Sequence, residues 1–146
     1  MKALIVASLS LASSIAFALS PAMEKQFVDT YKKAYEAKDE KTLNGLLYTK
    51  GADPQALEFY KMMLTADMSG KITTIKLVDL DAEDKQKAGA TMKGPGGAEM
   101  KLTLPAVKKL VIEMASTDGN GSSSSSSFIG EADGKLWIDT PGPAKK

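Results

Sequence analysis

The stretch FVDTYKKAYEAKD, residues 27–39, decides the fold that we expect for this chain. Phe27, Tyr31 and Tyr35 recur at four-residue spacing, and charged side chains occupy the other faces of the same segment. This is the pattern of an amphipathic helix that packs an aromatic stripe against a core. We therefore expect a long first helix, after which Asp39 is placed to cap a second one.

Two further helices are expected before any strand. The short helix capped by Asp39 is followed by Gly51, which ends that region. The next helix begins at Asp53-Pro54, because an N-cap residue followed by proline at the first helical position favours helix initiation. The apolar residues with helical spacing are Leu43, Leu46 and Leu47 in the short helix, and Leu57, Tyr60, Leu64 and Met68 in the longer one.

After Gly70 the residue pattern favours strands. Residues 71–80 are rich in Ile, Thr, Leu and Val, which suit a pleated surface, and the acidic residues 79–84 end that strand. Apolar residues alternate on both sides of the turn at 94–97, which is typical of a hairpin. In chain order we then expect a strand over 110–114, a loop over 117–127, strands over 128–129 and 136–138 around a turn at 133–134, and a frayed tail over 141–146.

Helices followed by antiparallel strands predict an α+β domain with N-terminal helices packed on a curved, cone-like sheet. The order resembles the nuclear-transport-factor-2-like (SnoaL-like) superfamily, whose cone shape is related to that of cystatins, over roughly residues 24–140. Residues 27–39 are similar to its opening helix, and EADGKLW, residues 131–137, is similar to its closing hairpin. The resemblance implies a pocket between helices and sheet, used by some members for catalysis and by others for binding, and dimers formed across the sheet.

Residues 1–18 have the features of a secretory signal peptide. Lys2 precedes an uncharged run that is shorter than the roughly 20 residues of a membrane span, and Ala16-Phe17-Ala18 places small residues at a cleavage site. We expect cleavage after Ala18, with Ala22 as the alternative. The mature chain would be a single soluble domain over residues 19–140 with a flexible tail over 141–146, exported by a bacterium to the periplasm or the medium.

The composition excludes several kinds of chemistry. The chain has no Cys and no His, and its 19 basic residues, all Lys, are balanced by 18 acidic ones. Disulfides, thiolate catalysis, lipidation on Cys and imidazole chemistry are therefore excluded. Without Arg or a basic stripe, nucleic acid is not an expected partner. We predict no cofactor and no metal, because the acidic runs at 79–84 and 118–122 lack the final carboxylate of a calcium loop.

Four aromatic residues are the candidate ligand-binding set. Their hydroxyl and indole groups could orient an apolar ligand at a pocket wall, while core packing is the alternative explanation. No catalytic residue is predicted, and the serine run at 122–127 is interpreted as flexible loop rather than as a source of a nucleophile. The candidates are Tyr31, Tyr35, Tyr60 and Trp137.

The hypothesis that these observations favour is a non-catalytic exported domain that binds a small apolar molecule or a protein. The alternative is a small isomerase-type or hydrolase-type enzyme that uses a Tyr with an Asp or Glu in the cone pocket, as a carboxylate base with a Tyr donor needs no His. That enzyme requires a carboxylate within hydrogen-bond reach of a Tyr hydroxyl. A third possibility is a domain that works mainly as a homodimer.

Overall fold

A computed structural model describes residues 19–66 and 68–144 of the chain, so the expected signal peptide lies outside the described residues. The α+β class is confirmed. The elements are α1 (Pro21–Glu36), α2 (Glu40–Asn44), α3 (Pro54–Thr65), β1 (Lys71–Val78), α4 (Ala82–Gly89), β2 (Met92–Lys93), β3 (Glu99–Leu102), β4 (Ala106–Ala115), β5 (Ser122–Ala132), β6 (Lys135–Ile138) and β7 (Pro141–Pro143).

Helices α2 and α3 begin where the predicted capping residues place them. The Asp39 side chain accepts a hydrogen bond from the backbone N–H of Thr42 at 3.0 Å, and Asp53 accepts from that of Ala56 at 2.9 Å. Ser20 caps α1 in the same way, by accepting from the Met23 N–H at 3.2 Å. Each cap satisfies a backbone donor that has no partner within its own helix.

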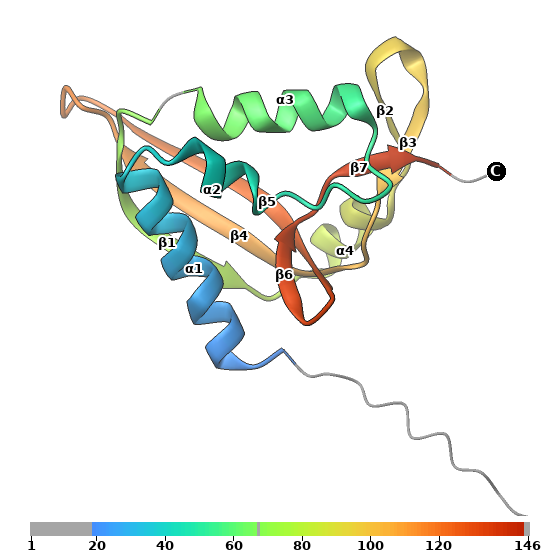
Figure 1. Cartoon of the computed structure of the whole chain (residues 1–146), viewed down its shortest axis with the longest axis horizontal. Helices are drawn as coiled ribbons and strands as arrows, with labels where there is room; N and C mark the ends of the chain where they lie inside the picture. Colours follow the sequence, from blue (N-terminus) through green and yellow to red (C-terminus); the bar gives the residue numbers. More distant parts are fainter. Residues whose placement is uncertain (1–18, 67, 145–146) are drawn as a thin grey trace, which may run out of the picture.

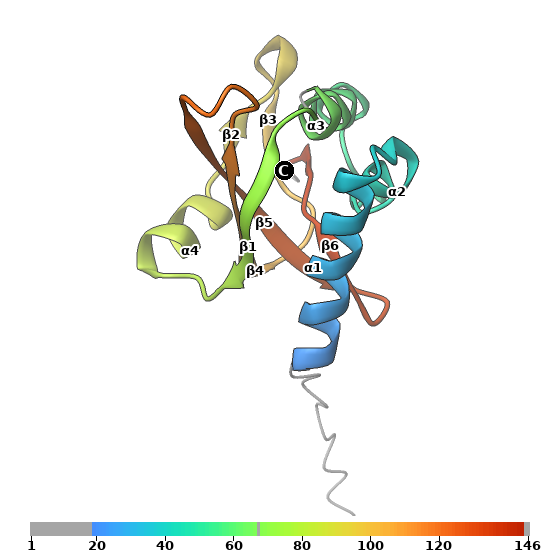
Figure 2. The ribbon, with the colours of Figure 1, turned by 90° about the vertical axis from the view of Figure 1, so that its left-hand side faces the viewer.

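The strands form two antiparallel sheets, in the orders β1-β4-β5-β6 and β2-β3-β7. The larger sheet curls around α1, with α2 and α3 on the same side, as Figure 1 shows. Helix α4 lies on the opposite side of the sheet from α1 and α2 (Figure 2). Helices held against a curled antiparallel sheet are the arrangement expected of a cone-like fold.

The core lies between the aromatic side of α1 and the concave side of the sheet. Phe27, Tyr31 and Tyr35 are each at most 5% exposed, so burial of the predicted stripe is confirmed. Apolar residues from α2, from the segment after it and from the strands complete this core: Leu43, Leu47, Ile72, Leu110, Ile112, Ile129, Leu136 and Ile138.

Residues 82–89 form α4, a helix that the sequence pattern does not predict. Asp81 accepts a hydrogen bond from the Asp84 backbone N–H at 2.7 Å, and the Asp84 side chain accepts from that of Asp81 at 3.3 Å. This reciprocal capping box starts a helix within the acidic run. The strand expected before the turn at 94–97 is therefore only the two residues of β2, although the hairpin around that turn is confirmed by the pairing of β2 with β3.

The loop expected over residues 117–127 is also wrong in its second half, because the six serines belong to β5. They pair with β4 in continuous register, from Leu110 opposite Ser127 to Ala115 opposite Ser122. Serine has little preference for strands on its own. The long apolar partner β4 therefore imposes the strand conformation on this segment.

The tail expected from Pro141 onward is a third difference. Pro141 and Gly142 are buried, and β7 pairs with β3. The Pro141 carbonyl also accepts a hydrogen bond from the Asp53 N–H at 2.9 Å. A proline pair lacks backbone donors, but acceptors and burial are enough to hold this segment at a sheet edge.

Candidate functional site

A groove of about 370 Å³ lies between α1, the residues after α2 and the β5–β6 hairpin. This volume is within the range of small-molecule pockets, roughly 300–1,000 Å³. Its walls are mainly apolar, with a few polar groups at the edge. The lining residues are Met23, Gln26, Phe27, Thr30, Gly45, Leu46, Gly134, Lys135, Leu136 and Trp137.

Backbone pairing holds the two sides of the groove together. The Ile138 N–H donates to the Leu46 carbonyl at 2.8 Å, and the Tyr48 N–H donates to the Ile138 carbonyl at 3.0 Å. Through these bonds the segment after α2 pairs with β6 in a short parallel bridge. The groove walls are therefore fixed by main-chain bonds as well as by side-chain packing.

Trp137 is the large aromatic residue of the hairpin wall. Its indole Nε1 donates a hydrogen bond to the Ala132 carbonyl at 3.0 Å. The indole ring meets the Tyr48 ring edge-on, with centroids 5.8 Å apart at 67°. Because its N–H is already bonded within the hairpin, Trp137 offers apolar ring surface to the groove rather than a polar tip.

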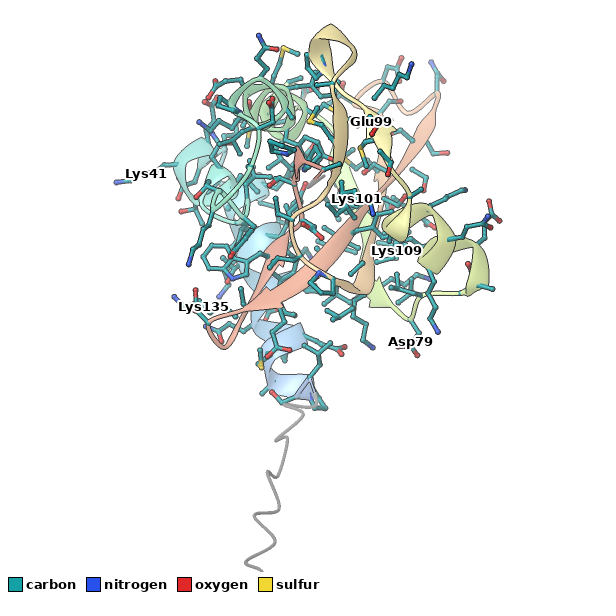
Figure 3. The ribbon with its side chains drawn as sticks, turned by 90° about the vertical axis from the view of Figure 1, so that its right-hand side faces the viewer. Lys41, Asp79, Glu99, Lys101, Lys109 and Lys135 are labelled. Atoms are coloured by element: carbon teal, nitrogen blue, oxygen red, sulfur yellow. The ribbon has the colours of Figure 1, made fainter. Side chains whose placement is uncertain are left out.

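The polar edge of the groove carries one positive charge. Lys135 lies at the start of β6 beside the hairpin turn, as Figure 3 shows, and makes no ion pair with any described residue. Gly134 completes that turn with a φ of +70°, a conformation that glycine adopts without strain. The Thr30 hydroxyl is used within α1, where it donates to the Gln26 carbonyl at 2.7 Å.

The four candidate aromatic residues do not share one pocket. Trp137 lines the groove, whereas Tyr31 lies in the core, where burial raises the pKa of its phenol to about 12. Tyr35 is also in the core, and it borders a second hollow of about 250 Å³ near the β4–β5 turn. Tyr60 is half-buried on α3. The role of these residues in binding stays a prediction.

Sequence reasoning missed a buried carboxylate, that of Asp139, which is 1% exposed. Its Oδ1 accepts from the Leu104 N–H at 3.1 Å and from the Thr103 hydroxyl at 3.2 Å, whereas its Oδ2 has no hydrogen-bond partner. Burial raises the pKa of this carboxyl. The pKa of the Tyr60 phenol is raised by the burial of Tyr60 and, to a smaller extent, by the charge of Asp139. The only sign of this buried carboxylate in the sequence is its position, directly after the alternating residues of the last strand.

The described residues contain neither a metal-binding cluster nor a helix that could span a membrane. Within residues 19–66 and 68–144, no group of three or more acidic side chains is arranged to hold a metal ion. No helix in the same part of the chain is long and apolar enough to cross a membrane.

Comparisons with known proteins give little beyond this geometry. No protein-family model matches the chain, and no curated protein matches it significantly. One solved structure with a related arrangement, from Xanthomonas campestris, is described as a calcium/calmodulin dependent protein kinase II association domain. It is 13% identical, with 84% of this chain and 86% of that chain covered, at a TM-score of 0.34. A likeness of this size carries no inference about function.

Proposed function

We propose that this protein is a non-catalytic binding domain that holds a small, mostly apolar molecule in the groove between α1 and the β5–β6 hairpin. The observation that carries the proposal is the groove itself, with Phe27, Leu46 and Trp137 in its walls and Lys135 at its edge. Apolar walls supply affinity and a single charge supplies orientation. The ligand class that fits is an apolar body with one acidic group.

The proposal includes export, with cleavage after Ala18. The start of α1 supports this site over the alternative after Ala22. Ser20 caps the helix and Pro21 is its first residue, so cleavage after Ala18 leaves both in the mature chain. Cleavage after Ala22 would remove the cap, at a cost of about 1 kcal/mol of helix stability.

Export is tested by expressing the full chain in a bacterium and measuring the intact mass of the periplasmic protein. We expect a chain that begins at Leu19. An uncleaved chain retained in the cytoplasm would overturn the export part of the proposal but would not bear on ligand binding in the groove.

Binding is tested with 8-anilinonaphthalene-1-sulfonate, a probe with an apolar ring system and one acidic group. Trp137 is the only tryptophan of the chain and lines the groove, so energy transfer from it reports probe bound to the domain, and a groove variant then locates that probe. We expect saturable transfer in the wild type. Gln26→Phe, which fills the groove from α1, should abolish that transfer.

The matched control is Lys32→Phe, which adds the same ring to an exposed position of α1 away from the groove. This variant should bind as the wild type does. A second control, Phe59→Ser, removes an exposed ring on α3 that could also attract the probe. If Gln26→Phe keeps full energy transfer, the groove is not the binding site.

The second candidate function is catalysis by a Tyr–carboxylate pair, which Asp139 and Tyr60 could provide. The unpaired Oδ2 and the raised pKa of Asp139 favour it. However, Oδ2 accepts no hydrogen bond from Tyr60, and Asp139 does not line the groove. An assay with ester and enone substrates decides the matter: turnover lost in Asp139→Asn but kept in Asp133→Asn would favour the enzyme.

A further inference from the structure

The serine half of β5 is an open sheet edge. Strand β6 pairs only with residues 129–132 of β5, whereas β4 pairs with β5 as far as Ser122. The β4–β5 hairpin therefore projects beyond β6, as Figure 1 shows. In the described structure, Ser122–Ser127 has a paired strand on one side and no paired strand on the other.

The direction of the backbone groups at this edge follows from the ladder with β6. The Phe128 carbonyl accepts from the Asp139 N–H at 2.9 Å, so the N–H and C=O of Phe128 point toward the β6 side. Strand β5 continues without a bulge from there to Ser122. Since backbone groups alternate sides along a strand, Ser122, Ser124 and Ser126 direct their N–H and C=O groups to the open edge.

This edge lacks the usual protection against strand pairing. The other edge strand of the sheet, β1, carries Lys71 and Lys76 and has a register irregularity between Ile72 and Thr74. Charged residues and bulges are the features that discourage an incoming strand. Residues 122–127 have no charge, no proline and no bulge, and five of the six serines are exposed.

We propose that this edge pairs with the same edge of a second copy of the chain, antiparallel and with the two-fold axis at Ser124. Ser122 would then lie opposite the partner's Ser126, and Ser126 opposite the partner's Ser122. In this register the three outward-facing residues of each copy form hydrogen-bonded pairs, which gives about six backbone hydrogen bonds. The two sheets become one continuous sheet, in contrast to a dimer across sheet faces.

A second copy fits this edge better than a foreign peptide. Strand addition gains its specificity from side-chain pockets, and a row of serines offers none. A run of identical small residues is self-complementary about a two-fold axis. The acidic residue nearest to the axis, Glu113, sits one strand back opposite Ser124, so the two Glu113 residues would be about 14 Å apart, beyond the Debye length of about 8 Å.

The association is measured by sedimentation velocity of the mature chain from micromolar to sub-millimolar concentration. We expect a reversible monomer–dimer equilibrium in the wild type and a monomer for Ser124→Pro. Proline is tolerated at an edge position whose N–H faces solvent, so this variant should still fold. Ser124→Thr keeps the N–H and should dimerise as the wild type does.

Ser126→Lys provides a second variant if the proline variant does not fold, because a lysine on the edge discourages pairing without removing a backbone donor. Amide hydrogen exchange identifies the surface itself. The amides of Ser122, Ser124 and Ser126 should exchange more slowly as the protein concentration rises. A wild-type chain that stays monomeric throughout, or a dimer that Ser124→Pro and Ser126→Lys leave intact, would overturn the proposal.

Discussion

At the scale of single residues, Asp139 is the group whose environment departs most from what its type favours. Carboxylates are seldom fully buried unless they are paired, yet this one is 1% exposed and has no cationic partner among the described residues. Its Oδ1 ties the Thr103–Leu104 corner to the end of β6 through two hydrogen bonds. Asp139 therefore stabilises the connection between these two segments, whereas the burial of Oδ2 without a hydrogen bond costs free energy.

The raised pKa of Asp139 predicts a specific pH dependence of stability. The folded chain holds this proton more tightly than the unfolded chain, whose Asp titrates near about 3.9. Ionised Asp139 therefore lowers stability at neutral pH, and that loss is recovered as pH falls through its folded pKa. In urea unfolding at pH 7 and at about pH 4, the wild type should gain stability relative to Asp139→Asn at the lower pH.

Asp133→Asn is the matched control, since Asp133 is exposed at the β5–β6 turn. Its stability relative to the wild type should be the same at both pH values. If Asp139→Asn also shows no pH-dependent difference, the buried carboxyl does not titrate in this range.

At the scale of elements, an ion pair between Lys109 and Asp84 links α4 to β4. Alternation along β4 turns Leu110 and Ile112 toward the core and Lys109 toward the opposite side, where α4 lies (Figure 3). The Lys109 Nζ donates to both carboxylate oxygens of Asp84, at 2.8 and 2.7 Å. The Lys109 hydrogen bond holds the pKa of Asp84 below its usual value, so the pair stabilises the fold above about pH 4 and is lost as pH falls through the lowered pKa.

Lys109→Met should therefore loosen α4 and lower the urea midpoint at pH 7, because it leaves Asp84 without its cation. Amide exchange of α4 should quicken more than that of β4. The comparison is Lys87→Met, which removes an ion pair with Glu83 whose side chains are 64% and 71% exposed. Exposed pairs contribute little, so this variant should unfold as the wild type does. Equal effects of the two variants would show that the Lys109 pair does not anchor α4.

At the scale of the whole molecule, the last described strand closes the fold. Strand β7 pairs with β3, and the Pro141 carbonyl accepts from the N-cap residue of α3, so the C-terminal segment joins the helical layer to the smaller sheet. Gly142 allows β7 to lie close to the backbone of Gly51. A Cβ added there would lie 2.2 Å from the Gly51 carbonyl oxygen and 2.9 Å from Thr103 Cγ2.

Gly142→Ala should consequently destabilise the chain by roughly 1–3 kcal/mol, because the added carbon meets backbone that cannot move aside easily. Urea unfolding measures the change. Gly89→Ala is the control: a Cβ there meets nothing within 4 Å, and alanine at this α4 position should be neutral or stabilise by up to about 1 kcal/mol. A neutral Gly142→Ala would show that β7 is a frayed end, as the sequence alone suggested.

Local patterns in the sequence are enough to predict several of the elements. The aromatic stripe of α1, the caps at Asp39 and Asp53 and the alternation in β4 depend on spacing along a short segment, and the structure confirms all of them. The capping box of α4 is equally local, but its acidic residues also fit the end of the preceding strand, which is what we expect from the sequence.

The other features depend on contacts between segments that are distant in the chain, so local patterns do not predict them. The serines of β5 are a strand because β4 pairs with them, and Pro141 is ordered because β3 and α3 bind it. The groove joins α1 to a hairpin about a hundred residues later, so no spacing could indicate it. Of the four predicted aromatic residues, burial placed two in the core and only Trp137 at the groove, since one helix face can pack inward or line a pocket and packing alone decides which.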